Sequence, residues 1–178
     1  MSDPIAANYL ENFRKTFRYY KTLGDKAFAQ LADGDFDRAL DAESNSIAVI
    51  AKHLGGNMRS RWRDFLTSDG EKPDRDRDDE FVAGGVGREQ VLAWWEEGWG
   101  HALRELDALR PEDLTRVVHI RGEAHTVVEA LNRQLAHAAY HVGQIVYLAK
   151  QWGGAQFQSL SIPRGKSDAF NQKMGITR

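Results

Sequence analysis

The feature that most constrains the fold is a long apolar segment in the last third of the chain, between Thr126 and Trp152. Apolar residues recur there at every third or fourth position: Val128, Leu131, Leu135, Ala138, Val142, Ile145 and Ala149. This spacing predicts a helix, and the glycine pair after Trp152 is a typical helix end. Because this helix is apolar on most of its sides, other helices must surround it, as in a bundle.

Three further helices are predicted from the same periodicity, and their approximate ranges are 4–31, 36–65 and 88–109. Asp3 can cap the first of them, and the DGD sequence that follows it is a typical helix breaker. We therefore expect an all-α four-helix bundle, folded as one domain over residues 1–178. A long crossover loop is expected between the second and third helices.

The connections between these helices carry turn signals. The stretch SDGEKPDRDRDDE at 68–80 contains proline and many charges of both signs, so we interpret it as a surface loop. Residues 114–125 alternate polar and β-branched types, which indicates a short extended piece or a hairpin with Gly122 at its turn. Gly55 and Gly56 lie inside a helical pattern instead. Each costs roughly 1 kcal/mol relative to alanine, which predicts a close approach or a bend there.

The composition restricts the chemistry. The chain has a net charge of −2 and no cysteine, which excludes disulfides, thiolate ligands and a cysteine nucleophile. Any metal is therefore bound through nitrogen and oxygen. No basic excess favours nucleic acid, and no uncharged apolar run approaches the ~20 residues of a membrane helix. Because the first residues also lack the pattern of a signal peptide, we expect a cytoplasmic protein.

Two histidines on the fourth predicted helix are the leading candidates for chemistry. His137 and His141 are four positions apart, so their side chains lie on one helix face and can bind the same divalent ion. The other residues of this face are uncharged: Ala130, Gln134, Gln144 and Leu148. A pair of hydrogen-bonded core histidines is the alternative, and from the pair alone it is the simpler interpretation.

A third histidine, on the second predicted helix, favours the metal interpretation. His53 adjoins the apolar stripe and is turned partly inward, and the second and fourth helices of an antiparallel bundle can face each other. Three imidazoles would form an open site for Zn²⁺, Ni²⁺ or Fe²⁺, with water or substrate in the remaining positions. His101, His119 and His125 are poorer candidates, because we expect them on a solvent-facing helix position and beside a turn.

Three stretches resemble a known family: HLGGNMRSRWRDFLTSDGEKP at 53–73, IRGEAHTVVEALNRQLAHAAYHVGQI at 120–145 and SIPRGKS at 161–167. With one histidine on the second helix and HxxxH on the fourth, the chain resembles a bacterial branch of unknown function within the DinB/YfiT-like superfamily. The resemblance covers nearly the whole chain and implies a four-helix bundle with His53, His137 and His141 as metal ligands. Some relatives are transferases or isomerases that use a low-molecular-weight thiol such as bacillithiol or mycothiol.

We therefore expect a metal-dependent enzyme that acts on a small molecule, as a hydrolase or a low-molecular-weight-thiol transferase. Its metal would polarise a carbonyl or lower the pKa of a bound water or thiol. Asn57, Gln134 and Gln144 are candidates for supporting the ligands or orienting the substrate. No general base stands out, since a solvated face explains Glu96 and Glu97 on the third helix equally well.

Two further features leave alternatives open. Arg164 and Lys166 flank a glycine in the tail, and they either clamp an anion at the mouth of the site or belong to a tail docked across the bundle. Trp94, Trp95 and Trp99 are interpreted as core and dimer packing, which predicts a homodimer. The alternative function is a non-enzymatic, metal-binding or stress-related dimeric bundle.

Overall fold

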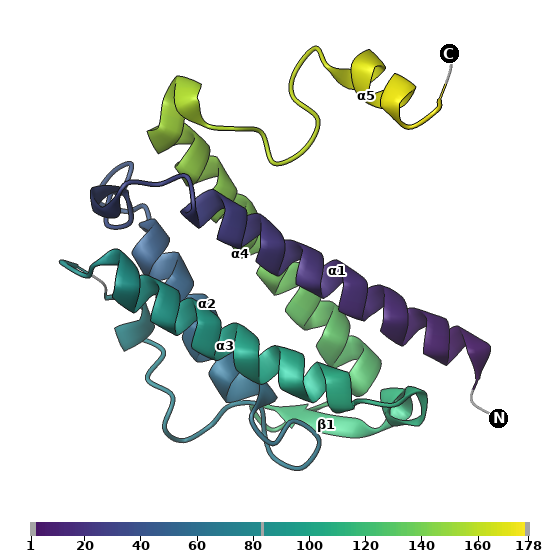
Figure 1. The fold of residues 1–178 in the computed structure, drawn as a ribbon. Coiled ribbons are helices and arrows are strands. Elements are labelled where there is room, and N and C mark those ends of the chain that lie inside the picture. Colours follow the sequence, from purple (N-terminus) through teal and green to yellow (C-terminus); the bar gives the residue numbers. More distant parts are fainter. Residues whose placement is uncertain (1–2, 83, 177–178) are drawn as a thin grey trace.

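The structure is a computed structural model that describes residues 3–82 and 84–176, whereas the expected domain also includes residues 1–2, 83 and 177–178. Four long helices form a bundle (Figure 1): α1 (Pro4–Phe28), α2 (Ile47–Trp62), α3 (Arg88–Ala108) and α4 (Val127–Gly153). No helix within these described ranges combines the length and the apolar character that crossing a membrane requires.

The remaining elements are short. They are the 3-10 turns η1 (Asp33–Asp35), η2 (Asp79–Phe81), η3 (Pro111–Thr115) and η4 (Gly154–Gln156), the antiparallel strands β1 (Val117–Ile120) and β2 (Glu123–Thr126), and α5 (Ser167–Lys173). Arg121 and Gly122 join the two strands, both with positive φ, so the predicted hairpin and its turn are confirmed. The structure also confirms the expected all-α bundle.

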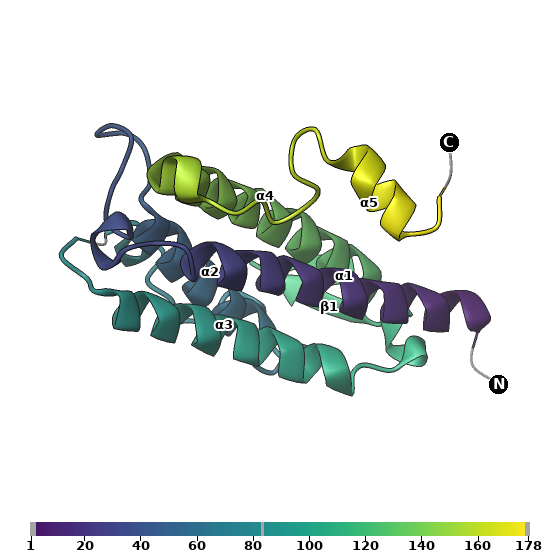
Figure 2. The same ribbon diagram turned by 45° about the horizontal axis from the view of Figure 1, so that its top comes forward.

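The helix directions explain the long crossover. α1 and α4 run in one direction, and α2 and α3 run together in the opposite direction (Figures 1 and 2). The connection over residues 63–87 must therefore return the chain along the length of the bundle. It passes beside α2 and the hairpin, which places its residues next to the histidine-bearing helices.

Capping interactions set the limits of the fourth helix. The backbone N–H of Glu129 donates to Thr126 Oγ1, and the N–H of Thr126 donates to the Glu129 carboxylate. Gly154, at a φ of 51°, follows the last helical residue. The predicted range of this helix is therefore correct to about one residue.

The second helix is shorter than predicted at both ends. It begins at Ile47 rather than around Phe36–Leu40, because the hydroxyl of Ser46 caps it. It ends before Phe65, because Asp64 adopts a left-handed conformation with a φ of 53°. Phe65 is nevertheless buried, so the apolar stripe marked a core position that lies outside the helix.

Glycines allow close packing around α2. A Cβ atom at Gly55 would lie 2.4 Å from the carbonyl oxygen of Trp94, and one at Gly98 would lie 2.5 Å from Gly55 Cα. A Cβ atom at Gly56 would lie 2.3 Å from Glu80 Oε1 in the crossover. The predicted close approach is therefore confirmed, and it brings both α3 and the crossover against α2.

Two of the three neighbouring tryptophans belong to the core. Trp95 donates from Nε1 to Asp25 Oδ1 at 2.7 Å, and the Trp99 ring centroid lies 4.5 Å from that of Phe17. Both side chains are fully buried, whereas Trp94 is half-buried. The expected core packing is confirmed, but Trp95 and Trp99 offer no surface to a second copy.

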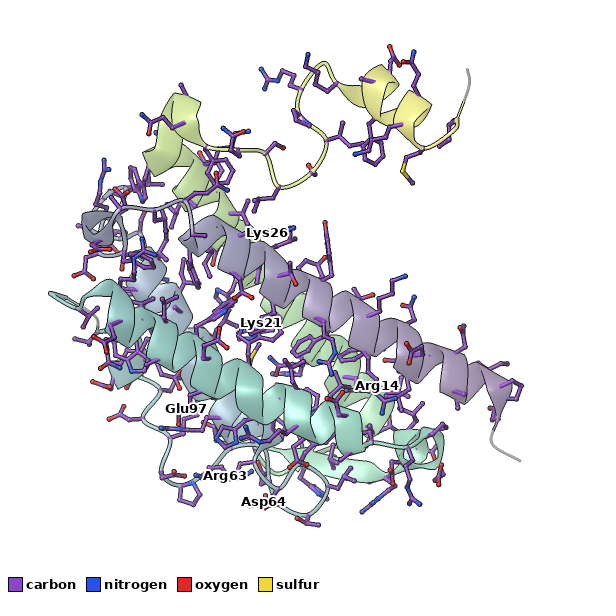
Figure 3. All side chains as sticks on the ribbon, in the orientation of Figure 1. Arg14, Lys21, Lys26, Arg63, Asp64 and Glu97 are labelled. Atoms are coloured by element: carbon purple, nitrogen blue, oxygen red, sulfur yellow. The ribbon has the colours of Figure 1, made fainter. Side chains whose placement is uncertain are left out.

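The C-terminal end of α3 is joined to α1 by Arg14, which lies between the two helices in Figure 3. Its guanidinium donates to the carbonyl oxygens of Leu106 and Leu109, at 3.1 and 2.7 Å. Carbonyls at a helix end lack partners within the helix, so this contact satisfies them and fixes the spacing of the two helices.

Candidate metal centre

Three histidines from α2 and α4 converge inside the bundle. The candidate ligand nitrogens of His53, His137 and His141 lie within 4.8 Å of one another, and His53 Nε2 is 3.1 Å from His137 Nε2. Two nitrogens bound to one tetrahedral Zn²⁺ at ~2.0–2.1 Å would be about 3.4 Å apart. The three side chains therefore lie close enough together to hold one metal ion.

Hydrogen bonds at Nδ1 orient two of these rings. His53 Nδ1 lies 2.9 Å from Glu80 Oε2, and His141 Nδ1 lies 2.8 Å from Gln144 Oε1. Both partner atoms are acceptors, so each Nδ1 carries a proton, and in the neutral form of each ring the lone pair is on Nε2. An oxygen acceptor behind the ring is the usual support of a ligating histidine. Gln144, a predicted supporting residue, occupies that position.

Hydrogen bonding within the group cannot satisfy all three histidines. His53 and His141 each present an Nε2 lone pair, and His137 can supply at most one Nε2–H. One N–H satisfies only one of the two lone pairs, whereas a divalent cation accepts electron pairs from all three rings. A divalent ion could therefore satisfy lone pairs that hydrogen bonds within the group leave unpaired.

Burial keeps two of the imidazoles neutral. It lowers the pKa of His137 to about 3, and the unfavourable interaction of a protonated His137 with His141 and His53 acts in the same direction. Burial also lowers the pKa of His141 to about 4, against the opposing effect of its bond to Gln144. Neutral imidazole is the form that binds metal, so these rings need no deprotonation at neutral pH.

The carboxylate behind His53 comes from the crossover, whose sequence predicts a surface loop. Glu80, in η2, is only 5% exposed, and Arg75 donates to both of its oxygens at 2.8 Å. Burial opposes ionisation of Glu80, but hydrogen bonds from Arg75 and His53 outweigh it and lower its pKa. The surface-loop interpretation is therefore wrong here, because these buried charges satisfy one another.

A cavity of about 310 Å³ adjoins the candidate ligands, with His53 and His137 in its wall. Asn57 and Gln134, both predicted from the sequence, also line it and are buried. Asn57 Oδ1 and Gln134 Nε2 lack hydrogen-bond partners among the described residues. The histidines are thus not sealed inside the core, and two polar atoms near them remain available to a ligand.

The predicted tail residues are not brought to this cavity. Arg164 and Lys166 are exposed and are not among its lining residues. The tail starts where α4 ends, and in both ribbon views α5 lies on the side of α1 and α4 away from α3 and the hairpin (Figures 1 and 2). Gln158 binds Gln30 on the way, so only the first part of the tail docks on the bundle.

The two glutamates considered as bases also lie outside the cavity. Glu96 pairs with Lys21 at 2.8 Å, and Glu97, labelled beside α3 in Figure 3, lies 3.7 Å from Arg59. Both side chains are exposed, as a solvated face predicts. His119 is exposed on β1, yet it lines the cavity, a position that the sequence did not indicate.

Comparison with known proteins identifies the family but no activity. A family model described as "Protein of unknown function (DUF1572)" matches residues 4–166, and no curated protein matches the chain. The match covers most of the sequence, so the chain belongs to this family. The expectation of a family of unknown function is confirmed.

Proposed function

We propose that this member of the DUF1572 family is a metal-dependent enzyme that acts on a small molecule, with His53, His137 and His141 as ligands of one divalent ion. The observation that carries the proposal is the convergence of three imidazoles beside a 310 Å³ cavity. Structural metal sites are normally closed by four protein ligands, whereas catalytic sites keep an open position. Three ligands beside a cavity fit the catalytic arrangement.

The residues around the ligands have distinct proposed roles. Glu80 and Gln144 hold the Nδ1 protons of two ligands, and Asn57 and Gln134 orient the substrate through their unpartnered polar atoms. A divalent ion bound here supplies Lewis acidity. Imidazole nitrogen suits Zn²⁺, Ni²⁺ and Fe²⁺ alike, so the donor set fits each of them.

The reaction that we propose is hydrolysis or transfer to a low-molecular-weight thiol. It follows the proposed affiliation with the DinB/YfiT-like superfamily, which the bundle and the placement of the histidines on the second and fourth long helices support. Glu80 is unsuited as a general base because Arg75 stabilises its ionised form. His119, an imidazole in the cavity wall outside the ligand set, is the proposed proton acceptor. From the same resemblance we propose a bacterial, cytoplasmic setting.

A non-enzymatic dimeric bundle is the second candidate. The observation that favours it is a groove of about 500 Å³ between α4 and the connection that precedes α2, lined by Leu40, Tyr140 and Tyr147 among others. Both tyrosines are 63% exposed, so a second copy can cover large side chains on this face. A homodimer through this face is proposed in place of one through the tryptophans.

Elemental analysis tests the metal site. Protein purified without a polyhistidine tag or chelator should contain about one divalent ion per chain. His137→Ala should lose most of the bound metal, because only two of the three imidazole ligands remain. His101→Ala is the matched control, since His101 lies on α3 and binds Arg104. Equal metal content in the wild type and His137→Ala would contradict the proposal.

Cobalt substitution separates the enzyme from the structural bundle. An open coordination position lets azide or a small thiol bind the cobalt and change its visible absorption spectrum. A closed site leaves the spectrum unchanged at every ligand concentration. The first result supports the enzyme, and the second supports the non-enzymatic alternative.

A further inference from the structure

Arginine side chains line much of the cavity beside the histidines. Among the described residues the lining contains no carboxylate and five guanidinium groups, those of Arg61, Arg75, Arg77, Arg121 and Arg133. They come from α2, the crossover, the hairpin turn and α4. The whole chain has a net charge of −2, so this concentration of positive charge is a local property that the fold creates.

The carboxylates nearby do not balance these charges. Glu71 lies 3.2 Å from Arg61 and 3.1 Å from Arg75, and Glu80 is bound by Arg75 behind His53. A third carboxylate, Asp69, accepts backbone N–H groups of the crossover and the hairpin turn. Among the described residues, the ion pairs of these five guanidiniums therefore involve two carboxylates, Glu71 and Glu80, which leaves an excess of positive charge in the lining.

Some of the arginines remain available to a ligand. The ion pairs of the described residues include neither Arg77 nor Arg133, and Arg77 lies over the Phe81 ring at 5.0 Å from its centroid. Arg61 Nη1 is buried and is not aligned to donate a hydrogen bond to Glu71.

The cavity also disfavours further positive charge. Burial lowers the pKa of Arg61 to about 10, and repulsion by Arg75, Arg121 and Arg133 acts in the same direction, against the attraction of Glu71. An anion in the cavity would relieve this repulsion. Beside the arginines, the unpartnered Gln134 Nε2 is a further donor.

We propose that this cavity binds a small anionic molecule through a carboxylate or phosphate group held by the arginines, with its reacting part beside His53 and His137. The inference rests on the proposed function and names its substrate class. Guanidinium groups donate paired, parallel hydrogen bonds to both oxyanions. A cavity of about 310 Å³ is at the small end of ligand pockets, which restricts the ligand to a small molecule.

The test is calorimetric titration of metal-free protein at constant ionic strength with inorganic phosphate, with succinate and with the neutral analogue succinamide. Metal-free protein is used so that binding to the ion does not contribute. At least one of the two anions should bind, and succinamide should not. The anion that binds more tightly identifies the group. Binding of neither anion, or equal binding of succinamide, overturns the inference.

Variants locate the binding. Arg77→Gln and Arg133→Gln should each weaken anion affinity at least tenfold, and both side chains are exposed without ion pairs, so folding should persist. Arg133→Lys should recover part of the loss, because the charge returns without the paired donors. Arg164→Gln, in the exposed tail, is the control and should bind as the wild type does. Unchanged affinity in both cavity variants, or a loss in Arg164→Gln, overturns the location.

Metal analysis of the same proteins keeps the two proposals separate. Anion binding in a protein that takes up no metal supports the arginine cavity and contradicts the enzyme proposal. Metal binding without anion binding contradicts only the inference made here. Retention of the metal in Arg77→Gln and Arg133→Gln shows that the loss of the anion is local.

Discussion

The pair formed by Glu80 and His53 makes a quantitative prediction about metal affinity. In Glu80→Gln one oxygen can still accept from His53 Nδ1, but the charge is lost and Arg75 loses one of its two acceptors in this side chain. Residues that support a ligand in this way typically contribute 10–100-fold to metal affinity. We therefore expect the Zn²⁺ dissociation constant to rise by that factor, which is about 1.4–2.7 kcal/mol.

Competition with a chromogenic chelator at pH 7.5 measures this change. Glu71→Gln is the matched control, because Glu71 also binds Arg75 but makes no contact with a histidine. The zinc dissociation constant of Glu71→Gln should change less than about threefold, because the loss of a partly exposed ion pair typically costs little free energy. If both variants weaken zinc equally, Glu80 acts through general loop stability, and the argument about His53 fails. An unchanged constant in Glu80→Gln refutes it directly.

Four other predictions concern the site and the scaffold. Zn²⁺ at a hundredfold excess over its dissociation constant should stabilise the wild type by ~2.7 kcal/mol in thermal melts. His53→Asn should lose most of this gain. An equal gain in both proteins would show that His53 is not a ligand. Gly98→Ala should destabilise the fold by about 1–3 kcal/mol in urea titrations, because its Cβ would lie 2.5 Å from the α2 backbone. Gly143→Ala has open space around it and should stabilise the fold by up to about 1 kcal/mol. A change of the same sign in both variants would be inconsistent with the packing. The free energy of unfolding of metal-free protein should fall as the pH falls from about 6.5 toward about 4, by about 1.4 kcal/mol per pH unit for each of His137 and His141. The reason is that their folded pKa values lie below that of an unfolded histidine, so the unfolded chain binds more protons. A flat profile in urea titrations would contradict their burial as neutral rings. Sedimentation at micromolar concentration should show a dimer, and a monomer at all concentrations would refute the proposed self-association.

Local sequence signals predicted the long helices well and their ends unevenly. The fourth helix has a capping box at Thr126 and a glycine at its end, so its limits follow from local chemistry. Periodicity predicts too early a start for the second helix, because the apolar spacing extends back through a segment of turns to Phe36. Periodicity records which residues are buried, and Phe36 is buried without being helical.

The candidate ligands were predictable, whereas their surroundings were not. His137 and His141 are close in sequence, and helix geometry alone places them together. Glu80 lies in a stretch of mixed charges, and this sequence pattern does not distinguish charges that face solvent from charges that pair inside the protein. The one signal that could have located it is Gly56, whose missing side chain makes room for that carboxylate. The arginine cavity draws on four separate segments, so no local pattern reveals it.

The wide separation of the candidate ligands along the chain has a consequence for biogenesis. His53 and His137 are 84 positions apart, and the contact between them closes a long loop whose entropic cost is repaid only when the bundle assembles. The last of the three histidines lies on α4, so a ribosome must synthesise α1, α2 and α3 before the candidate centre is complete. Under the proposed function, loading with metal would therefore follow the synthesis of α4, and a nascent chain stalled before α4 would offer only His53 of the three candidate ligands.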